Sequence, residues 1–494
     1  MKELSLPPST ESISVHTSLQ ERYQGFPNIS FDEFKYLTPE LKKLVLLRHP
    51  LVFTDTYNRT MEFLAGAERG KDAVFTLQLR KGVHGYHIIS GINELVRKIS
   101  QIRLTADMVE FASDYFSQVN GVRHFDKDRW MEIATSNDGK LPIRIDALPE
   151  GSIAFPGEPI VRVRGDAEMI AHFEPLFHRI FFATAVATNA CAITQIISPD
   201  RFIEVGLRGS VDDETHLIAG EAMYVGGGIY MTSDDALPAL HPQYQAVGTL
   251  GHRYVQSFDT EEEAFRHAIE KLDSVSLLVD LNDSYSGIDL AIRLKQEYRD
   301  TGKRIWIRLD SGDVAAQTIY TLQKLSELGM TDTKLDKVIV EGIETIAEIV
   351  AIEKLIAENG FNKENVMYGA GGLLLAKGTT RADVSSGFKL AYFDGAPSMK
   401  FSDSPTKASI PGIPTIQTDG DNRLTCQQEE RFGEDLLLPH LANGEIFNSS
   451  DLELAHTRAM LEFQKWGHLI NEKPHFSPLT QQIINFLARG GEKQ

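Results

Sequence analysis

The chain has 494 residues, 42% hydrophobic and 24% charged, the composition of an ordinary globular protein with one large and one smaller domain, or three small ones. Its net charge of −19 argues against non-specific binding of nucleic acid. No apolar run approaches the roughly 20 residues of a membrane-spanning helix, and the N-terminus lacks the apolar segment of a signal peptide. The two cysteines, Cys191 and Cys426, have no metal-ligand spacing and fit a reducing compartment, so we expect a cytoplasmic protein without zinc or iron–sulfur chemistry.

The first 180 residues show no regular repeat. Residues 1–148 mix helical patterns with short strands and predict an N-terminal α+β domain. The stretch LPEGSIAFPGEPIVRVRGD (148–166) places Gly and Pro turns between β-type runs. It predicts a small antiparallel β module within residues 149–180.

Residues 181–395 are the most regular part of the chain. Short β-branched or aliphatic runs recur about every 30 residues, the length of a βα unit. They are FIEVGLRG (202–209), AMYVGGG (222–228), YQAVGTLGH (244–252), SLLVDLND (276–283), RIWIRLDSGD (304–313), KVIVEG (337–342) and VMYGAGG (366–372). Helical patterns lie between them, such as the one that starts at Thr260 with Glu263 in a capping-box position. The alternation predicts a parallel sheet with right-handed crossovers, either an α/β barrel or an open, doubly wound sheet.

The stretch IRLDSGD (307–313) is where chemistry is most strongly indicated. A buried strand ends there in Asp310, Ser311, Gly312 and Asp313, as strands do at the catalytic face of an α/β barrel. Two carboxylates beside Arg308 could hold a phosphorylated, polyhydroxylated substrate and its metal. The alternative is a turn in which Asp or Ser caps the next helix.

The preceding strand also ends in carboxylates, at Asp280 and Asp283. Neighbouring strands that both end in carboxylates suggest a Mg²⁺–phosphate site or a clamp for sugar hydroxyls. Capping of the following helix by Asp283 or Ser284 is the alternative.

Other strand ends carry glycine, arginine and histidine. Residues 369–372 (GAGG), with Arg381 downstream, could bind a phosphate through backbone N–H groups, or form only a tight packing turn. Arg208 is costly to bury, so it either pairs with a carboxylate or faces an anionic ligand. His252 could serve as acid, base or phosphoryl acceptor, or be structural.

Taken together, these motifs resemble the nicotinate phosphoribosyltransferases and their nicotinamide relatives. The resemblance covers about residues 50–412, and no single motif carries it. The motifs, in chain order, are TDTYNRTM (54–61), RKGVHGYHIISGI (80–92), EGSIAFPGEPIVRVRGD (150–166), ATAVATNA (183–190), GLRG (206–209), YVGG (224–227), GTLGH (248–252), LLVD (277–280), IRLDSGD (307–313), GAGG (369–372) and FKLAYFDGAPSMKFSDSPTK (388–407).

The resemblance implies a type II phosphoribosyltransferase: an irregular, incomplete α/β barrel (181–395), an N-terminal α+β domain, and a C-terminal segment (396–494) that packs back on the N-terminal part. It also implies a homodimer with shared active sites. The reaction would join nicotinate to phosphoribosyl pyrophosphate with Mg²⁺, in NAD salvage. ATP hydrolysis through a phosphohistidine would drive it.

The resemblance also assigns roles to residues. His252 matches the phosphorylated histidine, and Arg308 and Asp310 match catalytic residues around the ribose and pyrophosphate. Mg²⁺ would bind through the pyrophosphate, with Asp310 or Asp313 as candidate ligands. Substrate contacts are expected from Tyr57, Arg208, Thr249, Asp280, Ser311, Gly342, Gly371, Gly372 and Arg381. Of these, Tyr57 would stack on the pyridine ring in the partner's site, while Gly371, Gly372 and Arg381 would hold the 5′-phosphate.

Some positions depart from the family pattern. Nicotinate-specific members usually carry two arginines where this chain has Arg208-Gly209, as the nicotinamide enzymes do, and a valine, Val205, replaces the usual ring-stacking phenylalanine. Nicotinamide therefore remains the alternative substrate. A non-catalytic, nucleotide-binding regulatory paralogue is the alternative from another class. An unrelated barrel acting on phosphosugars would need none of the motifs around Tyr57.

Overall fold

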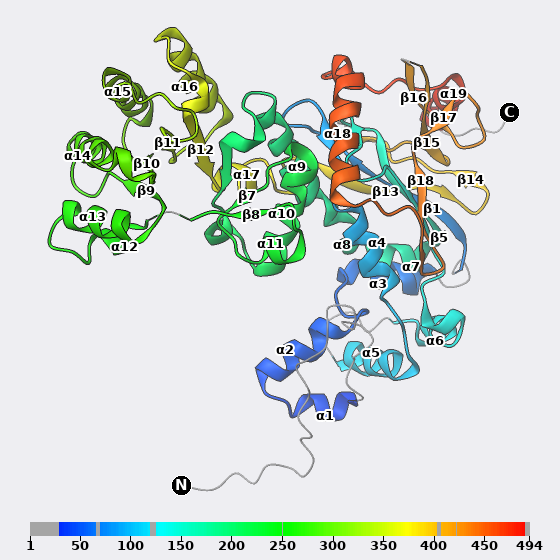
Figure 1. Cartoon of the computed structure of the whole chain (residues 1–494). Helices are drawn as coiled ribbons and strands as arrows, with labels where there is room; N and C mark the ends of the chain where they lie inside the picture. Colours follow the sequence, from blue (N-terminus) through cyan, green and yellow to red (C-terminus); the bar gives the residue numbers. More distant parts are fainter. Residues whose placement is uncertain are drawn as a thin grey trace, which may run out of the picture.

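The computed structural model describes residues 29–65, 70–118, 125–248, 250–402, 407–420 and 422–489. Two seven-stranded sheets organise the chain (Figure 1). One is parallel and lies with α12–α16 on one side of the molecule, and the other is antiparallel and lies on the opposite side. Each sheet has its own large hydrophobic core.

The parallel sheet has the strand order β8-β7-β6-β12-β11-β10-β9. Its strands are β6 (Phe202–Glu204), β7 (Met231–Thr232), β8 (Gln245–Ala246), β9 (Ser274–Leu278), β10 (Arg304–Leu309), β11 (Val338–Val340) and β12 (Val366–Ala370). The order follows the chain in one rotational direction, and the two edge strands, β8 and β9, are consecutive in sequence. A doubly wound sheet would reverse direction, so this is an α/β barrel left open between β8 and β9, and the prediction of an incomplete barrel is confirmed.

One predicted strand is wrong. AMYVGGG (222–228) belongs to helix α10 (Asp213–Gly227) and its C-cap Gly228, and the second strand of the barrel is β7 instead. A fully buried helix has an apolar run on every face, which a short sequence window cannot distinguish from a buried strand. The glycines permit close helix packing, because a Cβ on Gly226 would lie 1.9 Å from the carbonyl oxygen of Ala187 in α9.

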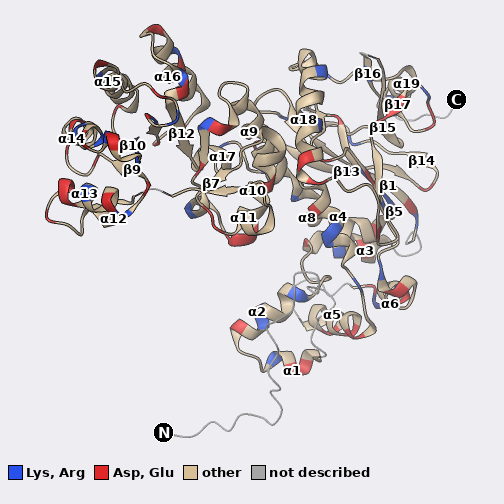
Figure 2. Ribbon diagram, in the orientation of Figure 1, with Lys and Arg blue, Asp and Glu red and all other residues tan. Residues whose placement is uncertain are grey.

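The four longer helices that follow the strands begin at side-chain caps. They are α13 (Glu261–Lys271), α14 (Ser284–Glu297), α15 (Val314–Glu327) and α16 (Ile346–Glu358). The short helices α11 (Leu237–Leu240), α12 (His252–Val255) and α17 (Gly372–Leu375) begin without a side-chain cap. The side chain of Thr260 accepts a hydrogen bond from the N–H of Glu263, as the sequence predicts. Acidic and basic side chains are interspersed on α13–α16, where the helices face solvent (Figure 2).

The antiparallel sheet has the order β14-β13-β1-β5-β3-β18-β19. Its strands are β1 (Asp72–Leu79), β3 (Arg144–Ala147), β5 (Pro159–Asp166), β13 (Ser386–Phe393), β14 (Ala396–Pro397), β18 (Leu438–Ala442) and β19 (Glu445–Ile446). Strand β5, from the stretch predicted as a small antiparallel module, is antiparallel but pairs with β1 and β3 of this larger sheet. Strand β18, from the C-terminal segment, pairs with β3 near the N-terminus.

Smaller elements complete this side of the molecule. They are α1 (Phe31–Lys35), α2 (Pro39–Arg48), α3 (Thr56–Ala65), α4 (Ile92–Ser100), α5 (Ala106–Gln118), α6 (Lys127–Thr135), α7 (Ala167–His172), α8 (Glu174–His178), α18 (Leu452–Trp466), α19 (Pro478–Ala488), a hairpin of β2 (His87–Ile88) and β4 (Ile153–Ala154), and a sheet of β15 (Pro414–Asp419), β16 (Asn422–Gln427) and β17 (Glu434–Asp435).

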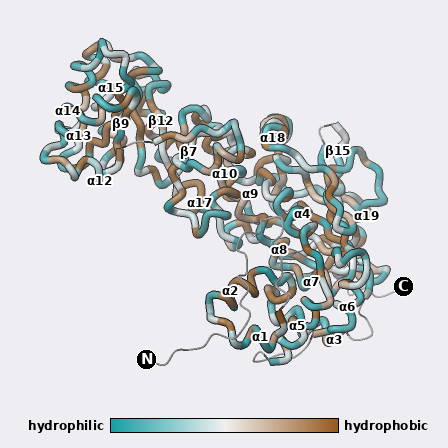
Figure 3. Tube along the Cα trace, turned by 60° about the horizontal axis from the view of Figure 1, so that its bottom comes forward, coloured by the Kyte–Doolittle hydropathy of each residue, from teal (hydrophilic) through white to brown (hydrophobic). Residues whose placement is uncertain are grey.

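Helix α9 (Ile180–Thr194) contributes side chains to both cores and so joins the two sheets. Hydrophobic residues gather on the strands and on α9 and α10, whereas connecting loops are mostly hydrophilic (Figure 3). Among the described residues, one stretch, Glu174–Thr194, is long and apolar enough to cross a membrane, with 21 residues and a mean hydropathy of 1.4. The sequence alone predicts no such run. Because 72% of its most apolar window is buried inside the protein, its composition is that of a core helix.

Candidate functional site

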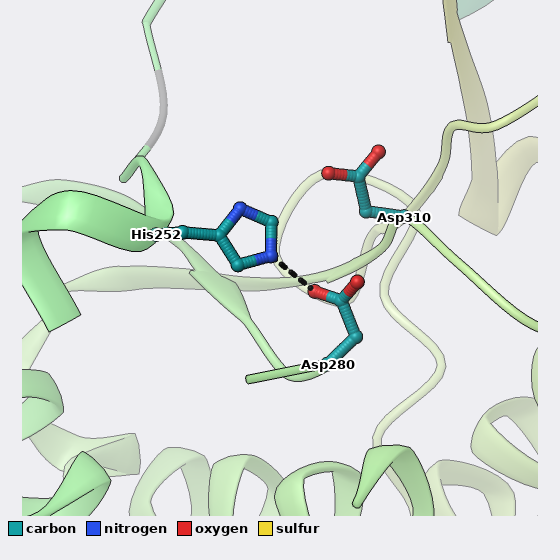
Figure 4. Close-up of side chains that lie close together, drawn as sticks. All are labelled: His252, Asp280 and Asp310. Carbon is teal, nitrogen blue, oxygen red and sulfur yellow. Dashed lines mark hydrogen bonds and ion pairs between the residues drawn. The ribbon is translucent and has the colours of Figure 1, made fainter. Parts of the chain in front are cut away.

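Three titratable side chains meet at the carboxyl end of the parallel sheet (Figure 4). Asp280 follows β9, Asp310 follows β10, and His252 begins α12 in the connection that crosses the open edge of the barrel. One ligand atom from each lies within 4.8 Å of the other two. The sequence predicts Asp280 and Asp310 at neighbouring strand ends, and the parallel pairing of β9 with β10 places them together.

Asp280 fixes the orientation of the histidine. His252 Nε2 lies 3.2 Å from Asp280 Oδ1, and the Ser311 hydroxyl donates to Asp280 Oδ2 at 2.5 Å. A carboxylate at Nε2 favours the tautomer with the proton there, which leaves the Nδ1 lone pair for chemistry. The Asp280 side chain is 5% exposed and the His252 side chain 43% exposed, so a buried carboxylate orients an accessible imidazole.

Arg308 is engaged by the protein rather than pointing freely into solvent. Its guanidinium donates to Asp310 at 3.0 Å and to Glu341 at 2.8 Å, and also to the carbonyl oxygen of Leu250 at 3.0 Å. The last contact ties β10 to the loop that carries His252. Burial raises the pKa of Glu341, against the opposing effect of Arg308. Sequence reasoning missed Glu341, although it too directly follows a predicted strand.

Glycines at this edge serve close backbone approaches. Gly342 has φ +72°, and a Cβ there would lie 2.7 Å from the carbonyl oxygen of Asp310. A Cβ on Gly371 would lie 2.3 Å from the Cα of Gly206, so the β12 and β6 loops touch, as the packing-turn alternative requires. Gly372, the first residue of α17, has open space around it.

Asp283 and Asp313 fit the capping alternative. Asp283 accepts a hydrogen bond from the N–H of Ser286, and Asp313 accepts one from the N–H of Ala316, each at the start of the helix after its strand. Thr249, another predicted contact, lies outside the described residues.

The carboxylates of Asp280 and Asp310 suit Mg²⁺, which prefers oxygen ligands and keeps part of its water shell. The His252 nitrogen does not belong to that ligand set. Asp280 and Asp310 are therefore the residues of this group that could hold Mg²⁺.

Two predicted site residues lie elsewhere. Tyr57, in α3, donates its hydroxyl to Glu174 of α8 at 2.6 Å and is half exposed. The charge of Arg381, which is exposed between α17 and β13, acts on the Tyr57 hydroxyl. Helix α3, which carries Tyr57, and strand β13, which follows Arg381, lie on the side of the antiparallel sheet, away from β9 and β10 (Figure 1).

Arg381 belongs to a group of cations that the sequence does not reveal. Arg80, Lys389 and Lys400 come from different segments, and burial lowers the pKa of Lys389, with Arg80, Lys400 and Arg381 lowering it further. Nε and Nη2 of Arg80 are buried with no hydrogen-bond partner among the described residues. Like charges held together in this way suit a polyanionic ligand.

Arg208 is exposed in a short turn after β6, and its charge acts on Glu341. It thus belongs to the same edge as His252 and Asp310. Val205 packs in a small apolar cluster with Ile203 and Met231.

The chain is similar in sequence to curated nicotinate phosphoribosyltransferases. No family model matches the chain. The nicotinate phosphoribosyltransferase pncB2 of Mycobacterium tuberculosis is 26% identical over 412 residues, 80% of this chain and 82% of the relative. The nicotinate phosphoribosyltransferase of Homo sapiens is 30% identical over 217 residues, 43% of this chain and 39% of the relative. That of Bacillus subtilis is 27% identical over 271 residues, 54% of this chain and 52% of the relative.

Solved structures share the fold. A crystal structure of human nicotinic acid phosphoribosyltransferase has a TM-score of 0.67 at 20% identity and covers 88% of this chain and 99% of its own. A nicotinate-nucleotide pyrophosphorylase from Pyrococcus furiosus has a TM-score of 0.62 at 16% identity, over 87% of this chain and 98% of its own. At these identities the likeness supports the incomplete barrel as the fold.

Proposed function

The chain belongs to the nicotinate phosphoribosyltransferase family, and we propose that it joins nicotinate to phosphoribosyl pyrophosphate, giving nicotinate mononucleotide and pyrophosphate for NAD salvage. The observation that carries the proposal is the convergence of His252, Asp280 and Asp310 at one strand edge. We place the reaction in the cytoplasm, with Mg²⁺ required and ATP as co-substrate.

The proposed reaction requires charged groups at this edge. As pyrophosphate leaves C1 of the ribose, positive charge develops on the sugar, and a carboxylate such as Asp310 stabilises it. Mg²⁺, when bound, neutralises charge on the leaving pyrophosphate. Arg308 holds Asp310 in place, and Arg208 supplies the cation for the nicotinate carboxylate.

ATP coupling would pass through His252. Nδ1 attacks the γ-phosphorus of ATP, an N–P bond forms, and the bond to the bridging oxygen breaks to release ADP. Asp280 keeps the proton on Nε2 and offsets the positive charge that the ring acquires. A phosphoryl group on His252 then adds negative charge beside Asp310, which favours Mg²⁺ and the closed, productive state.

We further propose a homodimer with shared active sites. Tyr57 belongs to α3, which lies away from β9 and β10 (Figure 1), and the charge of Arg381 acts on the Tyr57 hydroxyl, so we expect that neither reaches the edge within one chain. In a two-fold dimer, the second chain would bring its own Tyr57 and the cations around Arg381 to the first chain's edge. The partner would thereby add a ring-stacking tyrosine and further cations to the edge that already carries Arg208 and Arg308.

The test is a product assay. The purified protein receives phosphoribosyl pyrophosphate and Mg²⁺ with nicotinate or nicotinamide, with and without ATP, and the mononucleotide and ADP are quantified. We expect nicotinate mononucleotide, more of it with ATP, and loss of ATP coupling in His252→Ala. Preference for nicotinamide would reverse the substrate assignment. No product from either base, with nucleotide binding retained, would favour the regulatory paralogue.

A further inference from the structure

A second cluster of charged side chains is buried beside the edge, and the proposed reaction leaves it without a role. His216, in the first turns of α10, is 1% exposed and lies between two carboxylates. Its Nε2 is 3.3 Å from Asp234 Oδ2 and 3.9 Å from Glu204 Oε2. Glu204 ends β6 and is 2% exposed, and Asp234 follows β7 and is 6% exposed. We refer to these three residues as the His216 cluster.

The cluster holds both ends of the turn that carries Arg208. The N–H of Gly206, at the start of the turn, donates to Glu204. The Ser210 hydroxyl, at its end, is hydrogen-bonded to His216 Nδ1 at 3.1 Å. Between these anchors the backbone forms a single 3₁₀ turn with an exposed Arg208. Among the described residues the pairing of β6 ends at Glu204, before the turn, so the direction of Arg208 depends on the two ends of the turn.

The electrostatics explain why a histidine occupies this position. Burial raises the pKa of Glu204, while the hydroxyl of Thr232, which donates to Glu204 at 2.7 Å, and His216 act in the opposite direction. Two buried carboxylates side by side are unfavourable unless a proton donor or cation lies between them. His216 lies between them, with Nε2 close to both carboxylates, and its Nδ1 remains for Ser210.

We propose that His216 is a positioning residue for the base site: through Ser210 it sets the direction of Arg208, and thereby the affinity for the anionic group of the base. This inference rests on the proposed function. It predicts that loss of the Ser210–His216 link weakens nicotinate binding and leaves phosphoribosyl pyrophosphate binding unchanged. A purely structural role would instead lower stability and affect both substrates alike.

The variants separate the two nitrogens of His216. Ser210→Ala removes the link and leaves the buried charges in place. His216→Asn keeps an amide at the position of Nδ1, whereas His216→Gln keeps one near Nε2 and loses contact with Ser210. His267→Gln, at an exposed histidine of α13, is the matched control.

We expect the KM for nicotinate to rise about fivefold in Ser210→Ala and in His216→Gln, the effect of one hydrogen bond. The KM for phosphoribosyl pyrophosphate should stay within about twofold in both variants, as should both constants in the control. In His216→Asn, which keeps an amide near Ser210, the KM for nicotinate should rise less than in His216→Gln. Equal changes in both KM values, or no change in nicotinate KM for Ser210→Ala, overturn the inference.

Hydrogen exchange provides a readout independent of turnover. Amides of residues 206–210 should exchange faster in Ser210→Ala than in the unaltered protein or in His267→Gln. Unchanged exchange in Ser210→Ala overturns the anchoring role. Absence of turnover by the unaltered protein with either base instead contradicts the proposed function, so the two failures are distinct.

Discussion

The two ends of the parallel sheet hold charged residues in opposite ways. At the amino end, Arg201 precedes β6 and is 3% exposed, and its guanidinium donates to both carboxylate oxygens of Glu353 and to the carbonyl oxygen of Val366. The Tyr368 hydroxyl also donates to Glu353, at 2.7 Å. Arg201 and Glu353 are buried and paired with each other, and only Lys363, 3.7 Å from Glu353, connects this described network to solvent.

At the carboxyl end, the side chains remain open to a ligand. His252 is 43% exposed and Asp310 25% exposed at their side chains, although each has a protein partner. In α/β barrels the amino end carries stability and the carboxyl end carries function. Charged residues occur at both ends, so charge alone does not identify a site. A structural network differs from a candidate site in that its charged groups are buried and their hydrogen bonds are made within the protein.

The largest expected effect is on stability, at the amino end. Glu353→Gln leaves Arg201 buried without a full counter-charge and should lower the free energy of unfolding by about 3–5 kcal/mol. Urea unfolding followed by circular dichroism measures it, with Glu358→Gln, exposed on the same helix, as the control. The KM values of the folded variant should not change, and a selective change in them would place this network in the site.

The next effect is on catalysis, at the carboxyl end. Asp310→Asn removes the charge that faces the developing cation, so kcat should fall about a hundred- to a thousandfold. Stability should change little, because Arg308 keeps its bond to Glu341. Steady-state kinetics and thermal unfolding separate the two, with the exposed Asp300→Asn as control. A fully active variant would remove Asp310 from the proposed mechanism.

Sequence alone predicted much of the carboxyl end. Strand ends are marked by apolar runs that stop at polar residues, so Asp280 and Asp310 could be identified, and parallel order brings them together. The rest depends on tertiary contacts. His252 and Asp280 are 28 positions apart, and the His216 cluster extends over 30 positions, from Glu204 to Asp234, so no local sequence pattern reveals either set of contacts.

Other features could not be predicted for different reasons. AMYVGGG lacks the polar face that would mark it as a helix, because α10 is buried between α9 and α18. Tyr57 and Arg381 are far apart in sequence and come near each other only in the fold. Whether a partner chain uses these two residues depends on how two chains assemble, and no pattern in the sequence of one chain shows that.

A complementation experiment tests whether the active site combines residues from two chains. If the edge of one chain uses Tyr57 of the other, Tyr57→Ala and Asp310→Asn chains should each be poorly active alone. Unfolded together and refolded as a mixture, half of the dimers would contain one intact site, giving about one quarter of the unaltered activity. Mixing either variant with itself is the control. Activity no higher than the sum of the separate variants would mean that the sites are not shared.

The smallest expected effect tests which residues after β10 belong to the site and which only cap the next helix. Asp310 and Asp313 lie three residues apart, but Asp313 accepts from the N–H of Ala316 as a helix cap. Asp313→Ala should therefore lower the free energy of unfolding by about 1 kcal/mol, as should Asp283→Ala at the matching cap of α14. Denaturant unfolding measures both, and kcat should stay within about twofold in each, since a cap lost at the helix surface leaves the facing carboxylates in place. If kcat falls much further in Asp313→Ala than in Asp283→Ala, Asp313 contacts Mg²⁺ or substrate. The candidate site would then include Asp313, which its hydrogen bond to Ala316 identifies as a helix cap.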